Sequence, residues 1–339
     1  MNKKPTVAVI IPFYNGARWI ERAVKSVAEQ TVKADEFIVV NDGSRPDERS
    51  ILDLLAEKYD FRILDKENGG QGSARNAAVA ATRAEYLCFL DQDDFYLDTH
   101  IETLLDNLPE NDRRLGFVYA DLHIADGDGG LIFTSSVKEH SPSNPKRSLI
   151  DLLRTDMFVL PSASLISREA FLAVGGFDPR FTGYEDDDLF LRLFRKGYTN
   201  YFIDRPVTVW CMHTGSTSWS IKMSRSRFRY FKKLAASFQD DAAKRIFYFR
   251  DCLVPRFGRA FIVDAIQSAK NGSEHREEVC QILREYRDIV CSHSEVPMRY
   301  KLKLRLSTFF LTGFSAPITR TFGIAYRTPL LRRIAVKLL

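Results

Sequence analysis

Short apolar runs alternate with amphipathic segments along the first hundred residues, and this alternation limits the folds open to the chain. The apolar runs have the length of buried strands, and the segments between them have a helical pattern. The expected strands are 7–11, 36–40, 61–64 and 86–90, and the expected helices are 17–30, 46–58 and 72–83. This βαβα order predicts an α/β fold, a mainly parallel sheet flanked by helices.

The pattern loosens after Asp94. Further elements are expected as helices near 97–108 and 168–174 and strands near 116–124 and 162–166. The polar stretch 136–147 is typical of a binding loop or a mobile lid. From about residue 221 the pattern is helical, with interruptions expected at Pro255, Gly258, Gly272, Pro297, Gly313 and Pro317. We therefore expect one domain at 1–220 and a mostly helical region at 221–339.

The two regions differ in charge. Residues 1–220 carry 25 Lys and Arg against 34 Asp and Glu, whereas residues 221–339 carry 24 against 10. The last part, 297–339, has nine basic side chains and no acidic one, interleaved with Phe, Leu and Ile. This composition predicts contact with an anionic membrane surface rather than with nucleic acid. A helical bundle packed on the first domain, or a partner interface, is the alternative for this region.

The cysteines and the hydropathy indicate the compartment. Five cysteines at unrelated spacings contain no C-x-x-C pair, which argues against a disulfide framework or a zinc site. The chain begins with a short polar stretch that lacks the features of a signal peptide, and no apolar run is long enough for a spanning helix. We expect a cytoplasmic protein, free or bound peripherally at the inner face of the cell membrane.

Acidic residues follow the expected strands at several points. Asp42 ends the run Val39-Val40-Asn41-Asp42, and Asp91 and Asp93 follow the run 86–90. Because parallel strands present their carboxyl ends at one edge of a sheet, these carboxylates are expected to converge there. Paired carboxylates suit Mg²⁺ or Mn²⁺ shared with substrate phosphates, although Asp42-Gly43-Ser44 alone is also a common turn.

Four segments in this order resemble family 2 glycosyltransferases, which have the GT-A fold. They are Val9-Ile10-Ile11-Pro12-Phe13-Tyr14-Asn15, Val39-Val40-Asn41-Asp42-Gly43-Ser44, Asn68-Gly69-Gly70-Gln71-Gly72-Ser73-Ala74-Arg75-Asn76 and Leu90-Asp91-Gln92-Asp93-Asp94. The resemblance covers about residues 5–215. It implies a nucleotide-sugar site formed by Pro12, Tyr14, Asn15, Asp42, Gly70, Arg75, Asp91 and Gln92. Asn41 stands where the family often has Asp.

The resemblance also implies catalytic and metal-binding residues. Asp186, in the run Glu185-Asp186-Asp187-Asp188, matches the general base of the family, with Glu185 beside it. Acids in a first helical turn are also favoured by the helix dipole, which is the structural alternative for this run. Asp93 and His213 would hold Mn²⁺ or Mg²⁺ with the diphosphate, and Cys211 stands where the family often has Arg.

These residues predict an inverting, metal-dependent glycosyltransferase. It would move a sugar from a nucleoside-diphosphate sugar, with a UDP-sugar favoured, to a saccharide or lipid-linked acceptor in cell-surface glycan synthesis. The alternatives are a catalytically inactive subunit that binds nucleotide or glycan, and a sugar nucleotidyltransferase. The second would require an early triphosphate loop rich in Gly and Lys, which residues 12–22 lack.

Overall fold

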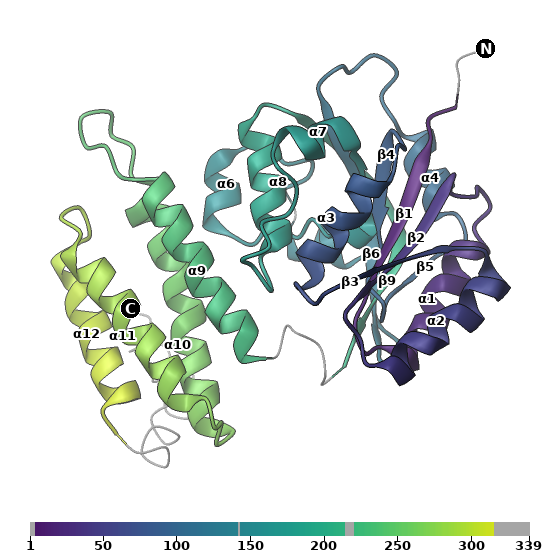
Figure 1. Cartoon of the computed structure of the whole chain (residues 1–339). Helices are drawn as coiled ribbons and strands as arrows, with labels where there is room; N and C mark the ends of the chain where they lie inside the picture. The colour runs from purple at the N-terminus through teal and green to yellow at the C-terminus, as the bar shows by residue number, and fades with distance from the viewer. Residues whose placement is uncertain (1–3, 142, 214–219, 315–339) are drawn as a thin grey trace. The chain divides into compact units, whose positions relative to one another are not determined.

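The computed structural model describes residues 4–141, 143–213 and 220–314. It forms two compact units (Figure 1). The first unit comprises Met1–Ser148 and Asp156–Ser216, and the second comprises Leu149–Thr155 and Thr217–Leu339. The division expected at residue 220 stays a prediction, and Leu149–Thr155, which lies inside the expected first domain, groups with the second unit.

The first unit is built on one mixed sheet. Its strands are β1 (Val7–Phe13), β2 (Glu36–Asp42), β3 (Arg62–Lys66), β4 (Tyr86–Phe89), β5 (Phe95–Tyr96), β6 (Leu115–Asp126), β7 (Leu131–Phe133), β8 (Ser164–Ser167) and β9 (Thr199–Met212). They lie in the order β3-β2-β1-β4-β8-β6-β9-β5, and β7 pairs with β6. The central strands β1 and β4 are almost entirely buried, as uninterrupted apolar runs predict.

Helices cover both faces of this sheet. They are α1 (Ala17–Ala28), α2 (Pro46–Tyr59), α3 (Gln71–Ala81), α4 (His100–Asp106), α5 (Ser136–His140), α7 (Arg168–Ala173) and α8 (Glu185–Arg195), with the short 3₁₀ turn η1 (Pro161–Ala163). In Figure 1, α1 and α2 lie on one side of the sheet, and α3, α7 and α8 lie on the other. Right-handed crossovers explain this arrangement of helices. The chain moves across the sheet in one direction from β1 to β2 and β3, so α1 and α2 lie on one face. It then crosses back past β1 to form β4, so α3 lies on the other face.

The predicted α/β fold is confirmed, and its parallel pairing is concentrated in one half of the sheet. Strands β3, β2, β1 and β4 are mutually parallel, as the βαβα pattern predicted. Strand β8 is antiparallel to both β4 and β6, whereas the long strand β9, which the sequence pattern did not predict, is parallel to β6. Because β8 is only four residues long and follows a long excursion of the chain, its direction could not be read from local periodicity.

The described residues of the polar stretch 136–147 contact the sheet of the first unit. The stretch begins with α5, and Lys146 farther along is buried. The amide of Lys146 donates to Asn200 Oδ1 at 2.8 Å, and Asn200 Nδ2 donates to the Lys146 carbonyl at 2.9 Å. Tyr119 Oη also donates to Asn144 Oδ1 at 2.6 Å. These bonds attach Asn144 and Lys146 to β6 and β9, and the expectation of a binding loop or a mobile lid stays a prediction.

The second unit is helical. Its elements are α6 (Leu149–Arg154), α9 (Ile221–Ser237), the π-helical segment η3 (Phe249–Leu253), α10 (Val254–Lys270), α11 (Arg276–Ser292) and α12 (Met298–Thr312). The core is aromatic: the buried ring of Phe231 lies 5.4 Å from that of Phe257 and 5.1 Å from that of Tyr286. Within the part of the chain that the structure describes, no helix combines the length and apolarity that crossing a membrane requires.

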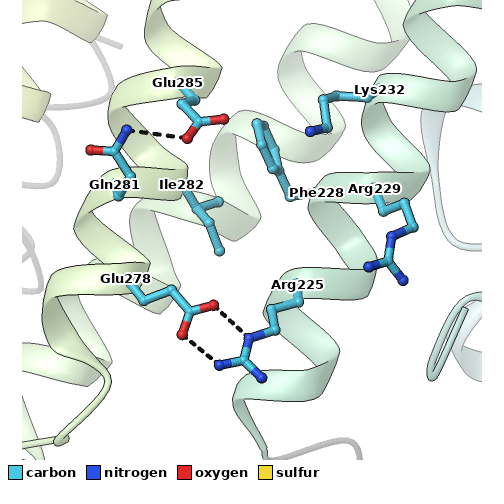
Figure 2. Close-up of a pocket in the computed structure, with 8 residues that line it drawn as sticks. All are labelled: Arg225, Phe228, Arg229, Lys232, Glu278, Gln281, Ile282 and Glu285. Atoms are coloured by element: carbon cyan, nitrogen blue, oxygen red, sulfur yellow. Dashed lines mark hydrogen bonds and ion pairs between the residues drawn. The ribbon is translucent and has the colours of Figure 1, made fainter. Parts of the chain in front are cut away.

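A small groove lies between α9 and α11 (Figure 2). Its volume is about 260 Å³, and it is lined by Arg225, Phe228, Arg229, Lys232, Glu278, Gln281, Ile282 and Glu285. Arg225 forms a bidentate ion pair with Glu278 across the groove, as Figure 2 shows. The volume is below the range of about 300–1,000 Å³ that is typical of small-molecule sites. We therefore interpret the groove as a gap between packed helices.

The sequence predicted that Gly258 would interrupt a helix. This prediction is wrong, because Gly258 lies inside α10. A Cβ atom at this position would lie 2.6 Å from Tyr286 Oη and 2.7 Å from Tyr300 Oη. Tyr286 Oη is itself fixed, because it donates to the Val254 carbonyl at 2.6 Å. The glycine therefore admits two tyrosine hydroxyls against the helix backbone, and its cost in helix propensity is offset by this packing.

Gly258→Ala is expected to destabilise the protein by about 1–3 kcal/mol, although alanine is the better helix former, because the added methyl overlaps buried hydroxyls. Thermal and urea unfolding would measure the change. Tyr286→Phe combined with Tyr300→Phe in the same background should recover part of the loss. If Gly258→Ala proved stabilising, the proposed packing constraint would be wrong.

Candidate active site

Three loops meet at the carboxyl ends of neighbouring parallel strands. Tyr14 follows β1, Asp42 ends β2, and Asp91 lies just beyond β4. Gln92 joins two of these loops, because its Oε1 accepts from the Tyr14 amide at 2.9 Å and its Nε2 donates to the Tyr14 carbonyl at 3.3 Å. A Cβ on Gly16 would overlap the amide end of the Gln92 side chain, so a larger residue at this position would displace Gln92 from this contact. The structure thus brings together the loops that the sequence placed at one sheet edge.

The loop after β1 presents one exposed aromatic ring. Pro12 is buried within β1, whereas Tyr14 is 48% exposed. Asn15, at φ 47°, turns the chain; its amide donates to Ser44 Oγ at 3.1 Å, and its Oδ1 accepts from the Arg45 amide at 3.0 Å. Asn15 therefore ties the loop after β1 to the loop after β2, and the Tyr14 ring remains free to stack on a planar ligand.

Asp42 organises the loop that precedes α3. Its buried carboxylate accepts from Lys66 Nζ at 2.6 Å, the Gly69 amide at 3.0 Å and the Gly70 amide at 2.7 Å. Gly70 has φ 85°, a conformation that disfavours other residues. Lys66 was missed by the sequence reasoning, although Asp42 and Lys66 are direct register partners on β2 and β3.

Arg75 connects the acidic group after β4 with the one on α8. Its buried guanidinium donates from Nη2 to Asp91 Oδ1 at 2.5 Å and from Nη1 to Glu185 Oε1 at 3.4 Å. The guanidinium also lies over the Phe177 ring, 5.0 Å from its centroid. Burial disfavours the charged guanidinium and acts to lower the pKa of Arg75. The negative charges of Asp91 and Glu185 outweigh burial, so the pKa of Arg75 is raised. Gln71, which the sequence reasoning did not single out, donates to the same oxygen of Asp91 at 2.5 Å.

Two adjacent carboxyl groups at the start of α8 have raised pKa values. Burial raises the pKa of Glu185, and Arg75 opposes this shift. Burial and the charge of Glu185 together raise the pKa of Asp186 to about 7. The Asp187 amide donates to Asp186 Oδ1 at 2.8 Å, which limits the rise by stabilising the ionised form. Asp186 therefore has the proton affinity expected of a base that works near neutral pH.

Asp93 and His213 lie side by side, as the sequence predicted. His213 Nε2 is 2.8 Å from Asp93 Oδ2, and the imidazole stacks on the Trp19 indole at a centroid separation of 4.4 Å. Burial and the neighbouring charge of Asp91 raise the pKa of Asp93, and His213 opposes this shift. Within residues 4–141, 143–213 and 220–314, no group of three or more His, Cys, Asp or Glu side chains could hold a metal ion.

Cys211 occupies the position where an arginine was expected from the resemblance, and a different arginine lies beside it. Arg22 of α1 donates from Nη2 to the Asp93 carbonyl at 2.7 Å and to Cys211 Sγ at 3.2 Å. The Cys211 amide donates to the buried carboxylate of Asp94 at 2.8 Å. Arg22 carried no motif in the sequence, and its place beside Asp93 follows only from the packing of α1 on the sheet.

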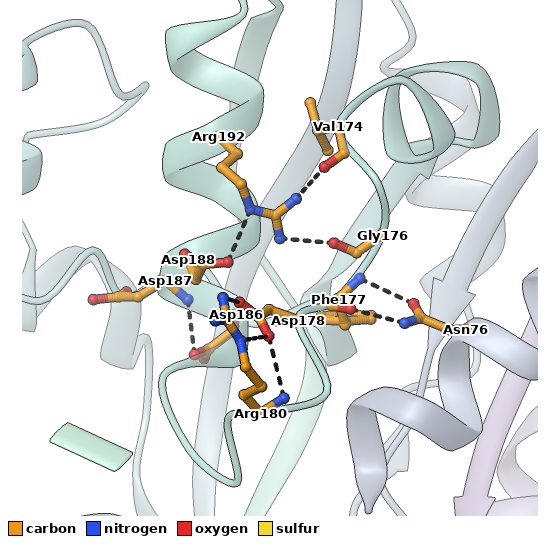
Figure 3. A network of polar contacts seen from close by, with 10 residues as sticks. All are labelled: Asn76, Val174, Gly176, Phe177, Asp178, Arg180, Asp186, Asp187, Asp188 and Arg192. Carbon is orange, nitrogen blue, oxygen red and sulfur yellow. Dashed lines mark hydrogen bonds and ion pairs between the residues drawn. The ribbon is translucent and has the colours of Figure 1, made fainter. Parts of the chain in front are cut away.

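A polar network fixes the chain in front of α8 (Figure 3). Arg192 donates from Nε to Asp188 Oδ2 at 2.8 Å, and its other nitrogens donate to the Val174 and Gly176 carbonyls. On the α3 side, Asn76 Nδ2 donates to the Phe177 carbonyl at 2.8 Å. Asn76 Oδ1 accepts from the Phe177 amide at 2.9 Å. The residues around Phe177 are therefore held from both helices, and this fixes the ring on which Arg75 lies.

Arg192→Gln is expected to lower the free energy of unfolding by roughly 2–4 kcal/mol, because it removes the cation that pairs with the buried carboxylate of Asp188 and donates to the Val174 and Gly176 carbonyls. Lys196→Gln, at an exposed position at the end of the same helix, is the matched control and should change stability by less than about 0.5 kcal/mol. Equal effects of the two variants in chemical unfolding would show that the network does not stabilise this unit.

Parts of the chain are similar in sequence to known protein families and to known proteins. Residues 8–175 match the family model described as glycosyl transferase family 2, and residues 161–215 match one described as the N-terminal domain of galactosyltransferase. An uncharacterized glycosyltransferase of Rickettsia prowazekii is 31% identical over 206 residues, which are 60% of this chain and 63% of the relative. The hyaluronan synthase of Pasteurella multocida is 30% identical over 198 residues, which are 58% of this chain and 19% of the synthase. The chain thus spans less than two thirds of either relative.

Solved structures share the fold over a longer stretch. S. aureus TarS 1–349 in complex with UDP-GlcNAc has a TM-score of 0.63 and 17% identity, covering 95% of this chain and 91% of that one. The mannosyltransferase PcManGT from Pyrobaculum calidifontis, in complex with GDP-Man and Mn²⁺, has a TM-score of 0.53 and 17% identity, covering 99% of this chain and 88% of that one. At these identities the likeness shows the fold alone.

Proposed function

Because this chain belongs to glycosyl transferase family 2 through residues 8–175, we propose that it transfers a sugar from a nucleoside-diphosphate sugar to an acceptor hydroxyl with inversion at the anomeric carbon. The observation that carries the proposal is the pair of adjacent carboxyl groups on α8. Arg75 pairs with Glu185, and Asp186 is left with a pKa of about 7. A carboxylate with this proton affinity suits the removal of a hydroxyl proton.

The donor is a nucleotide sugar, and a UDP-sugar is favoured. TarS, whose fold is the better match of the two solved structures, is described with UDP-GlcNAc, whereas PcManGT is described with GDP-Man. The exposed Tyr14 ring would stack on the base, and Asn15, Asp42 and Gly70 would shape the floor beneath the ribose. Asp91 and Gln92, at the end of the next strand, would face the donor sugar. The acceptor would be a saccharide or a lipid-linked saccharide.

Asp93 and His213 would hold Mn²⁺ or Mg²⁺. A carboxylate and an imidazole at 2.8 Å fit part of the coordination shell of such an ion, and diphosphate oxygens and water would complete it. Such an ion, when bound, neutralises charge on the leaving diphosphate. The absence of a third protein ligand among the described residues makes donor and metal binding mutually dependent in this proposal.

Different residues of the chain then have different roles in the reaction. Asp186 accepts the proton of the acceptor hydroxyl while the acceptor oxygen forms a bond to the anomeric carbon. The bond from that carbon to the diphosphate oxygen breaks on the opposite side, and the electron pair leaves with the nucleoside diphosphate. Arg75 holds Glu185 and Asp91 in place and keeps a positive charge beside the reacting groups.

Asp186→Asn is expected to lower turnover by about 10²–10⁴-fold and to leave donor affinity nearly unchanged, because an amide cannot accept the proton. Release of nucleoside diphosphate from a panel of UDP-, GDP- and dTDP-sugars would measure turnover, and calorimetry would measure donor binding. Asp204→Asn, at an exposed carboxylate of the same unit, is the matched control.

Near-native turnover of Asp186→Asn would show that another group is the base. Donor binding without turnover by the unaltered chain, with membrane extract supplied as acceptor, would favour the binding-subunit alternative. Loss of turnover in Asp93→Ala, together with loss of the Mn²⁺ or Mg²⁺ requirement for donor binding, would support the proposed metal ligands.

The pH dependence of turnover tests the raised pKa of Asp186. Because the ionised form is the base, kcat/KM should rise about tenfold per pH unit below pH 7 and level off above it. A carboxyl group with an ordinary pKa would instead give a level rate from pH 5 upward. A level profile between pH 5 and 8, with the protein folded throughout, would contradict this assignment.

A further inference from the structure

Helix α12 has two apolar faces. Lys301, Leu304, Thr308 and Leu311 are buried, on the side that packs on α10 and α11. The other face exposes Met298, Leu302, Leu306, Phe309 and Phe310, which we call the apolar stripe of α12. Leu306 is 60% exposed and Phe309 is 58% exposed, although large apolar side chains usually avoid water when they gather on one surface.

Cations border the apolar stripe. With 3.6 residues per turn, Arg305 lies along one edge, and Arg299 and Lys303 lie toward the other. No acidic residue occurs between Pro297 and Phe314. Long basic side chains can lay their methylene groups along such a stripe and keep their charged ends beyond it.

The C-terminal end of α12 is held in place within the second unit. Arg276 of α11 donates to the Leu311 carbonyl at 3.1 Å and to the Phe314 carbonyl at 3.0 Å, which satisfies acceptors at the end of the helix. The ring of Phe314 lies 5.4 Å from that of Phe309 and 5.9 Å from that of Phe310. The apolar stripe is therefore presented on a supported helix, with an aromatic group at one end.

We propose that the apolar stripe of α12 docks on an anionic lipid surface, with the helix lying in the plane of the interface. Its apolar side chains enter the boundary between headgroups and acyl chains, and the flanking cations meet the lipid phosphates. The charge pattern favours lipid over a second copy, because two such stripes facing each other would bring cations together without a counter-charge. At 15 residues, α12 is about 22 Å long and too short to span the roughly 30 Å hydrocarbon core.

This inference does not rest on the proposed sugar transfer. Docking would hold the second unit at a membrane whatever reaction the first unit performs. If the transfer is also correct, a lipid-linked acceptor would meet the enzyme in two dimensions rather than in solution.

Flotation of the full chain with lipid vesicles tests the proposal. Vesicles of phosphatidylcholine alone would be compared with vesicles that contain about a third phosphatidylglycerol, at low and high salt. We expect binding to the anionic vesicles, weakened by salt and at least about tenfold weaker without the anionic lipid. The apolar and the electrostatic contributions are then separated by two double variants.

Leu302→Gln with Leu306→Gln removes apolar area, and Lys303→Gln with Arg305→Gln removes charge. Each pair should weaken binding to anionic vesicles by about tenfold or more, and only the second should also reduce the salt dependence. Leu131→Gln with Ile132→Gln, at exposed apolar positions of β7, is the matched control and should bind like the unaltered chain. Circular dichroism and thermal unfolding would show that each variant is folded.

Two results would overturn the proposal. One is an absence of vesicle binding by the folded, unaltered chain at low salt. The other is a monomer–dimer equilibrium in light scattering that Leu302→Gln with Leu306→Gln abolishes while vesicle binding stays unchanged. That second result would assign the apolar stripe to contact between copies of the chain.

Discussion

The candidate site depends on the buried guanidinium of Arg75. It is the cation between the acidic loop after β4 and the acidic turn of α8, which are about a hundred residues apart in sequence and would repel each other without it. A buried ion pair of this kind is not a strong source of stability, because desolvation costs much of what the Coulomb attraction contributes. Removal of the cation would instead leave Asp91 and Glu185 close together and unpaired. Arg75 is thus better understood as the group that makes a cluster of carboxylates tolerable in one place.

The same arginine acts unequally on the two neighbouring carboxyl groups at the start of α8. Glu185 is in contact with the guanidinium of Arg75. Burial raises the pKa of Glu185, and the positive charge of Arg75 opposes that rise. Asp186 has only a weaker influence from Arg75, and the negative charge of Glu185 acts on it in the opposite sense. One residue is therefore suited to hold a structure together and the next to exchange a proton.

The sequence predicted the parts of the site that depend on local pattern. Strand ends in a parallel sheet meet at one edge, so the convergence of Asp42 and Asp91 could be inferred from the apolar runs before them. The pairing of Arg75 with Glu185 could not be inferred in this way. It requires β8 to lie antiparallel beside β4, so that α7 and α8 lie on the same side of the sheet as α3. Lys66 is an intermediate case. Its cross-strand partner Asp42 follows from the register of β2 and β3, but a parallel register is fixed by packing rather than by a turn.

The second unit shows where a periodicity argument reaches its limit. An amphipathic pattern identifies a helix with one buried face, and α11 fits this description, whereas α12 has apolar side chains on both sides. Large apolar side chains on both sides of a helix are ordinarily covered by protein on both sides, but α10 and α11 contact only one side of α12 among the described residues. The exposed side also carries the basic residues Arg299 and Arg305, and the helix contains no acidic residue. A helix surface with exposed apolar side chains and positive charges suits an anionic lipid membrane, which is apolar inside and negatively charged at its boundary.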